Sequence, residues 1–150
     1  MSGTNRCLID SNVLIYMYDD LAPDFQQQAV RVFEYLVSRH RAALSAQCLT
    51  EFFNGVTRRT RDPMQVSDAA ARVGRIASAT LVYPLTAEVV SEAVVAVGRY
   101  QMSIWDALIW SVAFRNGVPV IVTEDMQSQP VIAGVRYVNP FEPDFDIESL

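Results

Sequence analysis

The chain has 150 residues, a net charge of −5 and 51% hydrophobic residues, which is typical of a folded globular protein and excludes a disordered one. All 12 basic residues are arginine, which excludes a phosphate-binding lysine loop and a lysine Schiff base. The single histidine, His40, lies between two arginines, so we do not expect histidine-based catalysis or zinc binding; carboxylates are the abundant chemical groups.

Short apolar runs alternate with longer segments of helical periodicity along the whole chain. The first run ends at Asp10-Ser11-Asn12, which is typical of a helix start, and Thr86 and Ser103 are in position to cap later helices. We expect strands at 7–9, 42–44, 80–83, 118–122 and 135–138, and further helices at 23–39, 46–59, 63–77, 86–98 and 103–116.

Strands separated by helices indicate βαβ units, in which parallel strands pack between two helical layers. The sequence therefore predicts a three-layer α/β/α fold with a central, mostly parallel sheet of four to five strands. We find no linker or repeat, so we expect a single domain over 1–150, with an acidic tail from about 141 that is solvated and frayed.

The two cysteines, Cys7 and Cys48, lie among apolar neighbours, which favours free, buried thiols. No apolar run reaches the length of a membrane helix, and the first six residues do not resemble a secretion signal. We therefore expect a cytoplasmic protein without a membrane partner.

Four acids follow a predicted strand or begin the helix after one: Asp10, Glu51, Asp106 and Asp125. In an open parallel sheet, ligands bind beyond the carboxyl ends of the strands, at the point where the strand order reverses. Four carboxylates at one such edge repel each other unless a cation neutralises them. The shared position of the four acids therefore predicts a metal-dependent site.

Each acid taken singly also has a structural explanation. Asp10 can cap the first helix, and Ser103 with Asp106 resembles a capping box. Glu51 can be a solvated charge on a helix, and Glu124-Asp125 an ordinary turn. Only the joint pattern favours a site, and it leaves open whether Glu124 or Asp125 faces the metal.

Four motifs in order resemble the PIN-domain family, and nearly the whole chain takes part in the resemblance. They are Leu8-Ile9-Asp10-Ser11-Asn12, Leu49-Thr50-Glu51-Phe52, Ser103-Ile104-Trp105-Asp106-Ala107 and Thr123-Glu124-Asp125-Met126. The ending 134–141 is similar to a VapC-like subgroup, although Ser128-Gln129-Pro130 replaces the His-Gly-Gln of that subgroup. The resemblance implies a metal-dependent ribonuclease, the toxin of a toxin–antitoxin pair.

For this activity the resemblance implies Mg²⁺ or Mn²⁺, bound directly or through water by Asp10, Asp106 and Asp125. Glu51 is expected to orient water or to hold a second ion. Asn12, Ser103 and Thr123 are expected to fix the orientation of the carboxylates. The resemblance also implies a homodimer and a small antitoxin protein as partners, with RNA as the substrate.

Three arginines, Arg58, Arg59 and Arg61, cluster near the end of the predicted Glu51 helix, where they can contact RNA phosphates or simply favour the helix dipole. We expect Trp105, Trp110, Phe52 and Phe53 to be core or interface residues, with base stacking by Trp105 as the alternative.

Two other functions are compatible with an acidic α/β domain. Receiver domains and acidic-pocket phosphatases depend on a lysine, which this chain does not contain. A PIN fold without catalytic activity, serving as a scaffold or binding module, would keep the same fold, and metal-dependent cleavage separates it from the ribonuclease.

Overall fold

The computed structural model describes residues 5–125 and 131–150, and within them six strands form one sheet. The strand order is β3-β2-β1-β4-β6-β5, and every neighbouring pair is parallel except β5 and β6. The strands are β1 (Cys7–Ile9), β2 (Ala42–Ser45), β3 (Leu81–Tyr83), β4 (Val120–Val122), β5 (Val131–Ile132) and β6 (Val135–Val138).

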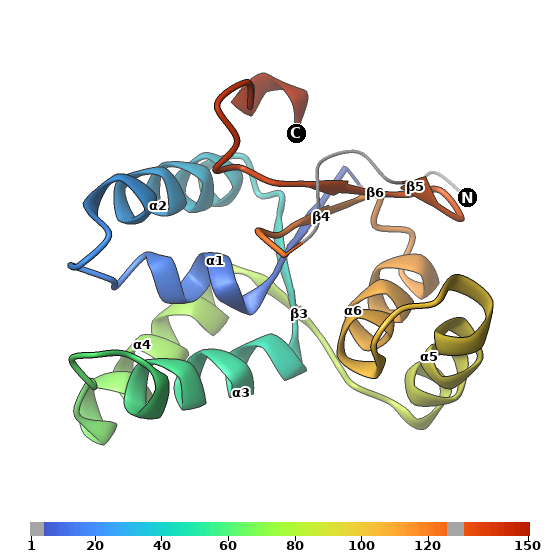
Figure 1. Ribbon diagram of the computed structural model, residues 1–150, viewed down its shortest axis with the longest axis horizontal. Coiled ribbons are helices and arrows are strands. Elements are labelled where there is room, and N and C mark those ends of the chain that lie inside the picture. Colours follow the sequence, from blue (N-terminus) through green and yellow to red (C-terminus); the bar gives the residue numbers. More distant parts are fainter. Residues whose placement is uncertain (1–4, 126–130) are drawn as a thin grey trace.

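Helices cover both faces of this sheet, so the predicted three-layer α/β/α fold is confirmed (Figure 1). One layer contains four helices, which pack on the face of β1 that carries Cys7 and Ile9. The opposite layer packs against Leu8 and Ile121. The first layer is α1 (Ser11–Tyr16), α2 (Pro23–Ser38), α3 (Ala46–Asn54) and α4 (Val66–Ala79), and the second is α5 (Ala87–Tyr100) and α6 (Ile104–Arg115).

The sequence located five of the six strands, and the sheet is one strand larger than expected. The additional strand, β5, is a two-residue edge strand that joins β6 through Ala133 and Gly134, both of which have positive φ. A strand this short has too few residues to show a periodic pattern. The segment 128–130 that departs from the VapC-like pattern lies outside the described residues.

The predicted helix 46–59 is divided into α3 and a π-helical turn over Gly55–Arg59. Gly55 is buried at the junction, where a Cβ would lie 2.5 Å from Cδ1 of Ile15. The missing side chain therefore lets α1 approach the end of α3 closely, and this contact supports the site described below.

The C-terminal tail corrects an expectation, because it packs against the domain rather than fraying. Ile147, in a short 3₁₀ helix (Ile147–Ser149), is buried in the core beneath α2. Arg41 donates to the carbonyl of Leu150 over 3.0 Å. Apolar residues between the acids of the tail provide this burial, which a reading of the charges alone does not reveal.

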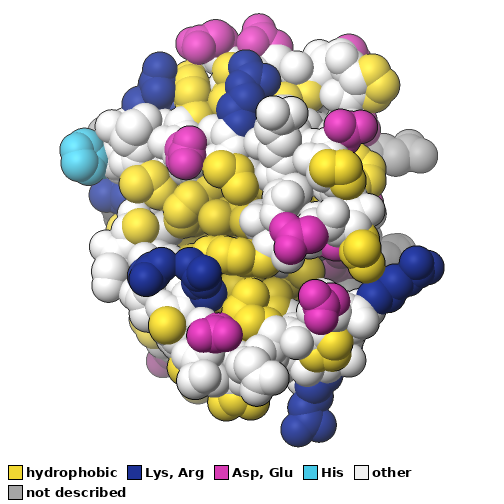
Figure 2. All heavy atoms as spheres, turned by 90° about the vertical axis from the view of Figure 1, so that its left-hand side faces the viewer, with side chains coloured by type: hydrophobic (Ala, Val, Ile, Leu, Met, Phe, Trp, Pro, Cys, Tyr) yellow, Lys and Arg dark blue, Asp and Glu magenta, His cyan; other side chains and the backbone are white. Residues whose placement is uncertain are grey.

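Apolar side chains also remain at the surface. Figure 2 shows them gathered in a band between charged side chains on the face where α1 to α4 lie. In the part of the chain that the structure describes, no helix combines the length and hydropathy needed to cross a membrane.

Candidate active site

Asp10 lies at the carboxyl end of the central strand and at the start of the following helix. Its backbone N–H continues the sheet by donating to the carbonyl of Val122 at 2.9 Å. Its side chain caps α1, since Oδ1 accepts from the N–H of Ser11 at 2.7 Å. The capping role read from the sequence is therefore confirmed, and it leaves the carboxylate at the edge of the sheet where β2 and β4 flank β1.

A network centred on Thr123 holds the second oxygen of this carboxylate. The buried Thr123 hydroxyl donates to Oδ2 of Asp10 at 2.9 Å. The hydroxyl oxygen of Thr123 itself accepts from Nδ2 of Asn12 at 3.1 Å and from the N–H of Asp125 at 3.2 Å. Oδ1 of Asn12 accepts in turn from the N–H of Glu124 at 3.2 Å. These bonds tie the end of β4 to the start of α1, so both oxygens of Asp10 have fixed directions.

Glu51 extends from α3 to meet Asp10. Carboxylate oxygens of Asp10 and Glu51 and the sulfur of Cys48 all lie within 4.8 Å of one another. Gln47 donates from Nε2 to Oε1 of Glu51 at 2.8 Å, one helical turn earlier on the same face. Ser45 starts this helix by capping the N–H of Gln47, so strand β2 and helix α3 together determine where Glu51 lies.

Burial raises the pKa of Asp10 from its ordinary value near 3.8 to about 6. The hydrogen bonds from Thr123 and Ser11 lower this pKa, whereas the charges of Glu51 and Asp125 raise it. Burial and like charge together exceed the hydrogen bonds, which is the usual outcome when carboxylates share a desolvated site. A nearby positive charge would remove this cost.

The structure distinguishes the two acids that follow β4. The charge of Asp125 acts on Asp10, whereas the carboxylate of Glu124 hydrogen-bonds to the hydroxyl of Tyr16. Glu124 also lines a cavity beside α1 together with Asn12. Of the two, Asp125 is therefore the one coupled to Asp10.

Asp106 begins α6, on the other side of the sheet. Ser103 caps this helix by accepting from the N–H of Asp106 at 3.1 Å, which confirms the predicted capping arrangement. Within the described residues, neither Asp106 nor Asp125 completes a group of three ligands at the spacing of Asp10, Cys48 and Glu51. Burial is the main cause of the raised pKa of Tyr137, and the charges of Asp106 and Asp10 both add to it, so both acids act on this buried hydroxyl.

The PIN-domain family matches this sequence over residues 7–132, which is most of the chain. The chain belongs to the PIN-domain family. A search among curated proteins finds no significant match.

Solved structures similar to this PIN domain include toxin–antitoxin assemblies. A toxin–antitoxin complex from Klebsiella pneumoniae has a TM-score of 0.65 at 18% identity, covering 91% of this chain and 98% of the other. DNA-bound VapBC from Salmonella typhimurium has a TM-score of 0.62 at 17% identity, with coverages of 90% and 98%. Mycobacterium tuberculosis VapC20, a sarcin–ricin loop cleaving toxin, has a TM-score of 0.59 at 16% identity, covering 77% of this chain and 86% of the other. At these identities the likeness establishes the fold.

The side chains of this PIN domain fit a hard divalent cation. Carboxylate oxygens are the ligands that such ions prefer, whereas soft ions select thiolates. Burial raises the pKa of Cys48 well above its usual value, so the thiol stays neutral and is a poor ligand. Among the described residues, the buried oxygens of Gln47 and Tyr137 have no hydrogen-bond partner. A hydrated ion would bring water to such groups.

Two cavities flank the acids of the PIN domain, and both are lined by Arg59 and Ile15. The smaller cavity, of about 290 Å³, also contains Glu51 and Trp105. The larger, of about 540 Å³, contains Arg61 and Glu124. Arg59 and Arg61 of the predicted arginine cluster therefore lie beside the acids, whereas Arg58 lines neither cavity.

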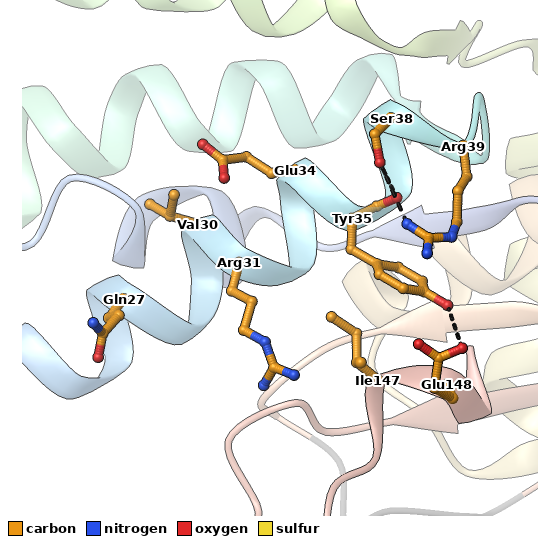
Figure 3. A pocket seen from close by; sticks show the side chains of 9 residues that line it. All are labelled: Gln27, Val30, Arg31, Glu34, Tyr35, Ser38, Arg39, Ile147 and Glu148. Carbon is orange, nitrogen blue, oxygen red and sulfur yellow. Dashed lines mark hydrogen bonds between the residues drawn. The ribbon is translucent and has the colours of Figure 1, made fainter.

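A larger groove, of about 690 Å³, lies away from the acids, between α2 and the C-terminal 3₁₀ helix (Figure 3). Two of its charged side chains, Arg39 and Glu148, contact Tyr35. The hydroxyl of Tyr35 donates to Glu148 at 3.3 Å, and the guanidinium of Arg39 covers the ring of Tyr35 at 3.8 Å. Size alone would select this groove, but the acids that converge in the PIN domain lie at the strand ends.

Sequence reasoning missed two polar residues of the site, and the structure removes one of the roles expected for Trp105. Gln47 belongs to none of the motifs, and Tyr137 lies in the family-like ending 134–141 without any sign of a role at the acids; only the fold brings them there. Phe52 and Trp110 are core residues as expected, and Phe53 is half-buried. Trp105 is not in the core, because 65% of its surface is exposed.

Proposed function

We propose that this PIN domain is a Mg²⁺- or Mn²⁺-dependent endoribonuclease, the toxin of a toxin–antitoxin pair. The observation that carries the proposal is the convergence of Asp10 and Glu51 at the end of the central strand, with the charge of Asp125 acting on the same carboxylate. Isolated helix caps and turns would not require Asp10 and Glu51, from two separate elements, to converge at a place where burial already raises the pKa of Asp10.

In this proposal Asp10, Asp106 and Asp125 hold the cation, directly or through water. When bound, the cation makes a coordinated water more acidic and offsets the charge on the departing oxygen. Thr123 and Asn12 keep the Asp10 carboxylate in place, while Gln47 holds one oxygen of Glu51. Glu51 then orients the water that attacks phosphorus, and Arg59 contacts a phosphate of the RNA from the wall that both cavities share.

Cleavage of a mixed RNA substrate tests this activity. We expect the wild type to cut with Mg²⁺ or Mn²⁺, and either EDTA or Asp106→Asn to abolish cutting, because the substitution keeps the size and removes a charge. Asp68→Asn is the matched control, since Asp68 is exposed in the first turn of α4. Undiminished cutting by Asp106→Asn would contradict the site. Metal binding without cutting would favour the catalytically silent scaffold.

We propose a small antitoxin and a second copy of the chain as protein partners. The similar toxin–antitoxin complexes support the antitoxin. Exposed apolar side chains on the second helical layer support the homodimer, among them Val94 at 59% and Phe114 at 44% exposure. Growth arrest on expression, relieved by a neighbouring gene product, would support the toxin. A monomer at micromolar concentration in light scattering would contradict the homodimer.

A further inference from the structure

Trp105 is the most exposed large apolar residue of its helix. The next turn, Leu108 to Trp110, is at most 6% exposed, whereas Trp105 is 65% exposed. Trp105 lies in the first turn of α6, directly before Asp106. An exposed indole leaves a large apolar area in water, and this ring lines a cavity next to the acid cluster.

The cavity beside Trp105 combines an aromatic wall with polar ones. Its other walls include Glu51 of the acid cluster, Arg59, Ser11 and Asn54. An aromatic face and a guanidinium in one cavity match the two parts of a nucleotide, because the base stacks on the ring and the phosphate pairs with the arginine. The Glu51 wall places such a nucleotide next to the proposed reacting phosphate.

A single ring among polar groups favours a nucleotide over a protein partner. Protein interfaces surround an aromatic anchor with further apolar side chains. Here the other large exposed apolar residue of α6 is Phe114, nine residues away at the far end, or roughly 13 Å along the axis. Besides Ile15 and Gly55, the groups that share the cavity with Trp105 are a carboxylate, an amide, a hydroxyl and a guanidinium.

We propose that Trp105 is a substrate-binding residue that stacks on an unpaired RNA base next to the scissile phosphate, with Arg59 pairing with a phosphate beside that base. The proposal rests on the ribonuclease function proposed above and adds a residue that holds the substrate at that site. Bases inside an RNA helix are stacked on their neighbours, so only a loop or a single strand presents a base face to the indole.

The test measures binding without turnover, in EDTA, by fluorescence anisotropy. The probes are a short labelled single-stranded RNA and an oligomer of the same length that carries ribose and phosphate but no bases. The wild type should bind the RNA about 5- to 100-fold more tightly than the abasic oligomer, the range that one stacked base provides. Trp105→Leu, which keeps an apolar side chain without a ring, should bind both oligomers with the weaker affinity.

Two control variants separate stacking from other effects. Arg59→Ala should weaken the binding of both oligomers equally, because its contact is to phosphate. Tyr35→Leu removes a ring from the groove between α2 and the C-terminal 3₁₀ helix, away from the acids, and should leave the affinity for RNA unchanged. Thermal unfolding of each variant establishes that it is folded.

The outcomes also separate this proposal from the ribonuclease itself. Cutting by the wild type, with equal RNA affinity in Trp105→Leu, would overturn the stacking while leaving the nuclease intact. Loss of antitoxin binding alone in Trp105→Leu would overturn it in favour of a protein contact. Equal affinity of the wild type for both oligomers would also overturn it. Base-dependent binding that disappears in Trp105→Leu supports the stacking even if no cutting is detected.

Discussion

The hydroxyl of Thr123 donates to Oδ2 of Asp10 at 2.9 Å, joining two residues that are 113 positions apart in the sequence. Thr123 follows β4 and Asp10 follows β1, and these strands are neighbours in the sheet. The bond therefore forms only when the parallel pairing is complete. It fixes one oxygen of a carboxylate whose other oxygen caps α1.

Thr123→Val tests this bond. Valine has the shape of threonine but cannot donate to Asp10 or accept from Asn12 and Asp125. We expect metal affinity to fall about 10- to 100-fold, the usual effect of losing a group that orients a ligand. Titration calorimetry with Mn²⁺ measures it. Thr123→Ser keeps the hydroxyl and should retain most of the affinity, and equal affinities in all three proteins would contradict the role of the bond.

The raised pKa of Asp10 predicts that the metal-free protein loses stability as the pH rises from about 4 to 6. The folded state holds the proton up to about pH 6, whereas an unfolded aspartate releases it near 3.8. Folding therefore becomes less favourable between these values, by about 3 kcal/mol in the unfolding free energy.

Urea unfolding in EDTA at pH 4 and pH 7 measures this loss. Asp10→Asn should remove that part of the pH dependence. The difference in unfolding free energy between the wild type and this variant therefore isolates the contribution of Asp10 from that of the other acids. Adding Mg²⁺ at pH 7 should restore stability to the wild type more than to Asp10→Asn, because the cation binds the ionised carboxylate. A parallel pH dependence in both proteins would contradict the desolvation of Asp10.

The two adjacent arginines of the π-helical turn should differ in their effect on RNA. Arg59 lines both cavities at the acids, whereas Arg58 lines neither. Arg59→Gln should weaken RNA binding and reduce the slope of log affinity against log salt by about 1, the value for one lost phosphate contact. Arg58→Gln is the matched control, and equal slopes for the two variants would assign both arginines to general surface charge.

Gly55→Ala should destabilise the protein, although alanine is the better helix former. The added Cβ would lie 2.5 Å from Cδ1 of Ile15, so α1 or the Ile15 side chain must move, at about 1–3 kcal/mol. Gly74→Ala, in the middle of α4 with nothing within 4 Å, should instead stabilise by about 0.5–1 kcal/mol. Urea unfolding measures both, and a stabilising Gly55→Ala would contradict the close contact of α1 with the end of α3.

Tyr137→Phe should raise the stability of the metal-free protein. Its hydroxyl is buried without a hydrogen-bond partner among the described residues, and such a group costs about 1–3 kcal/mol. Phenylalanine keeps the ring and removes that cost. Tyr35→Phe, which loses an exposed bond to Glu148, should change stability by less than about 0.5 kcal/mol. A Tyr137→Phe variant less stable than the wild type would indicate that water satisfies the hydroxyl.

Local features of this chain could be predicted because neighbouring residues determine them. The capping side chains of Asp10, Thr86 and Ser103 bond to backbone within three residues, and the apolar periodicity of each helix is local as well. Parallel strands bring their carboxyl ends to one edge of the sheet. Asp10 and Glu51 each follow a predicted strand or begin the helix after one, so their approach could be predicted from the order of strands and helices.

The tertiary structure alone decided which side chains face the acids and which face water. The rotation of each helix against the sheet determines which side chains reach the site. It directs Glu124 toward Tyr16 and brings Gln47 and Tyr137 toward the acids. It also places Arg59, but not Arg58, in the wall of the cavity beside Glu51. Trp105 and Trp110 are five residues apart on one apolar helix, yet one is exposed and the other buried. Burial depends on contacts between distant segments, which residue type and local periodicity do not contain.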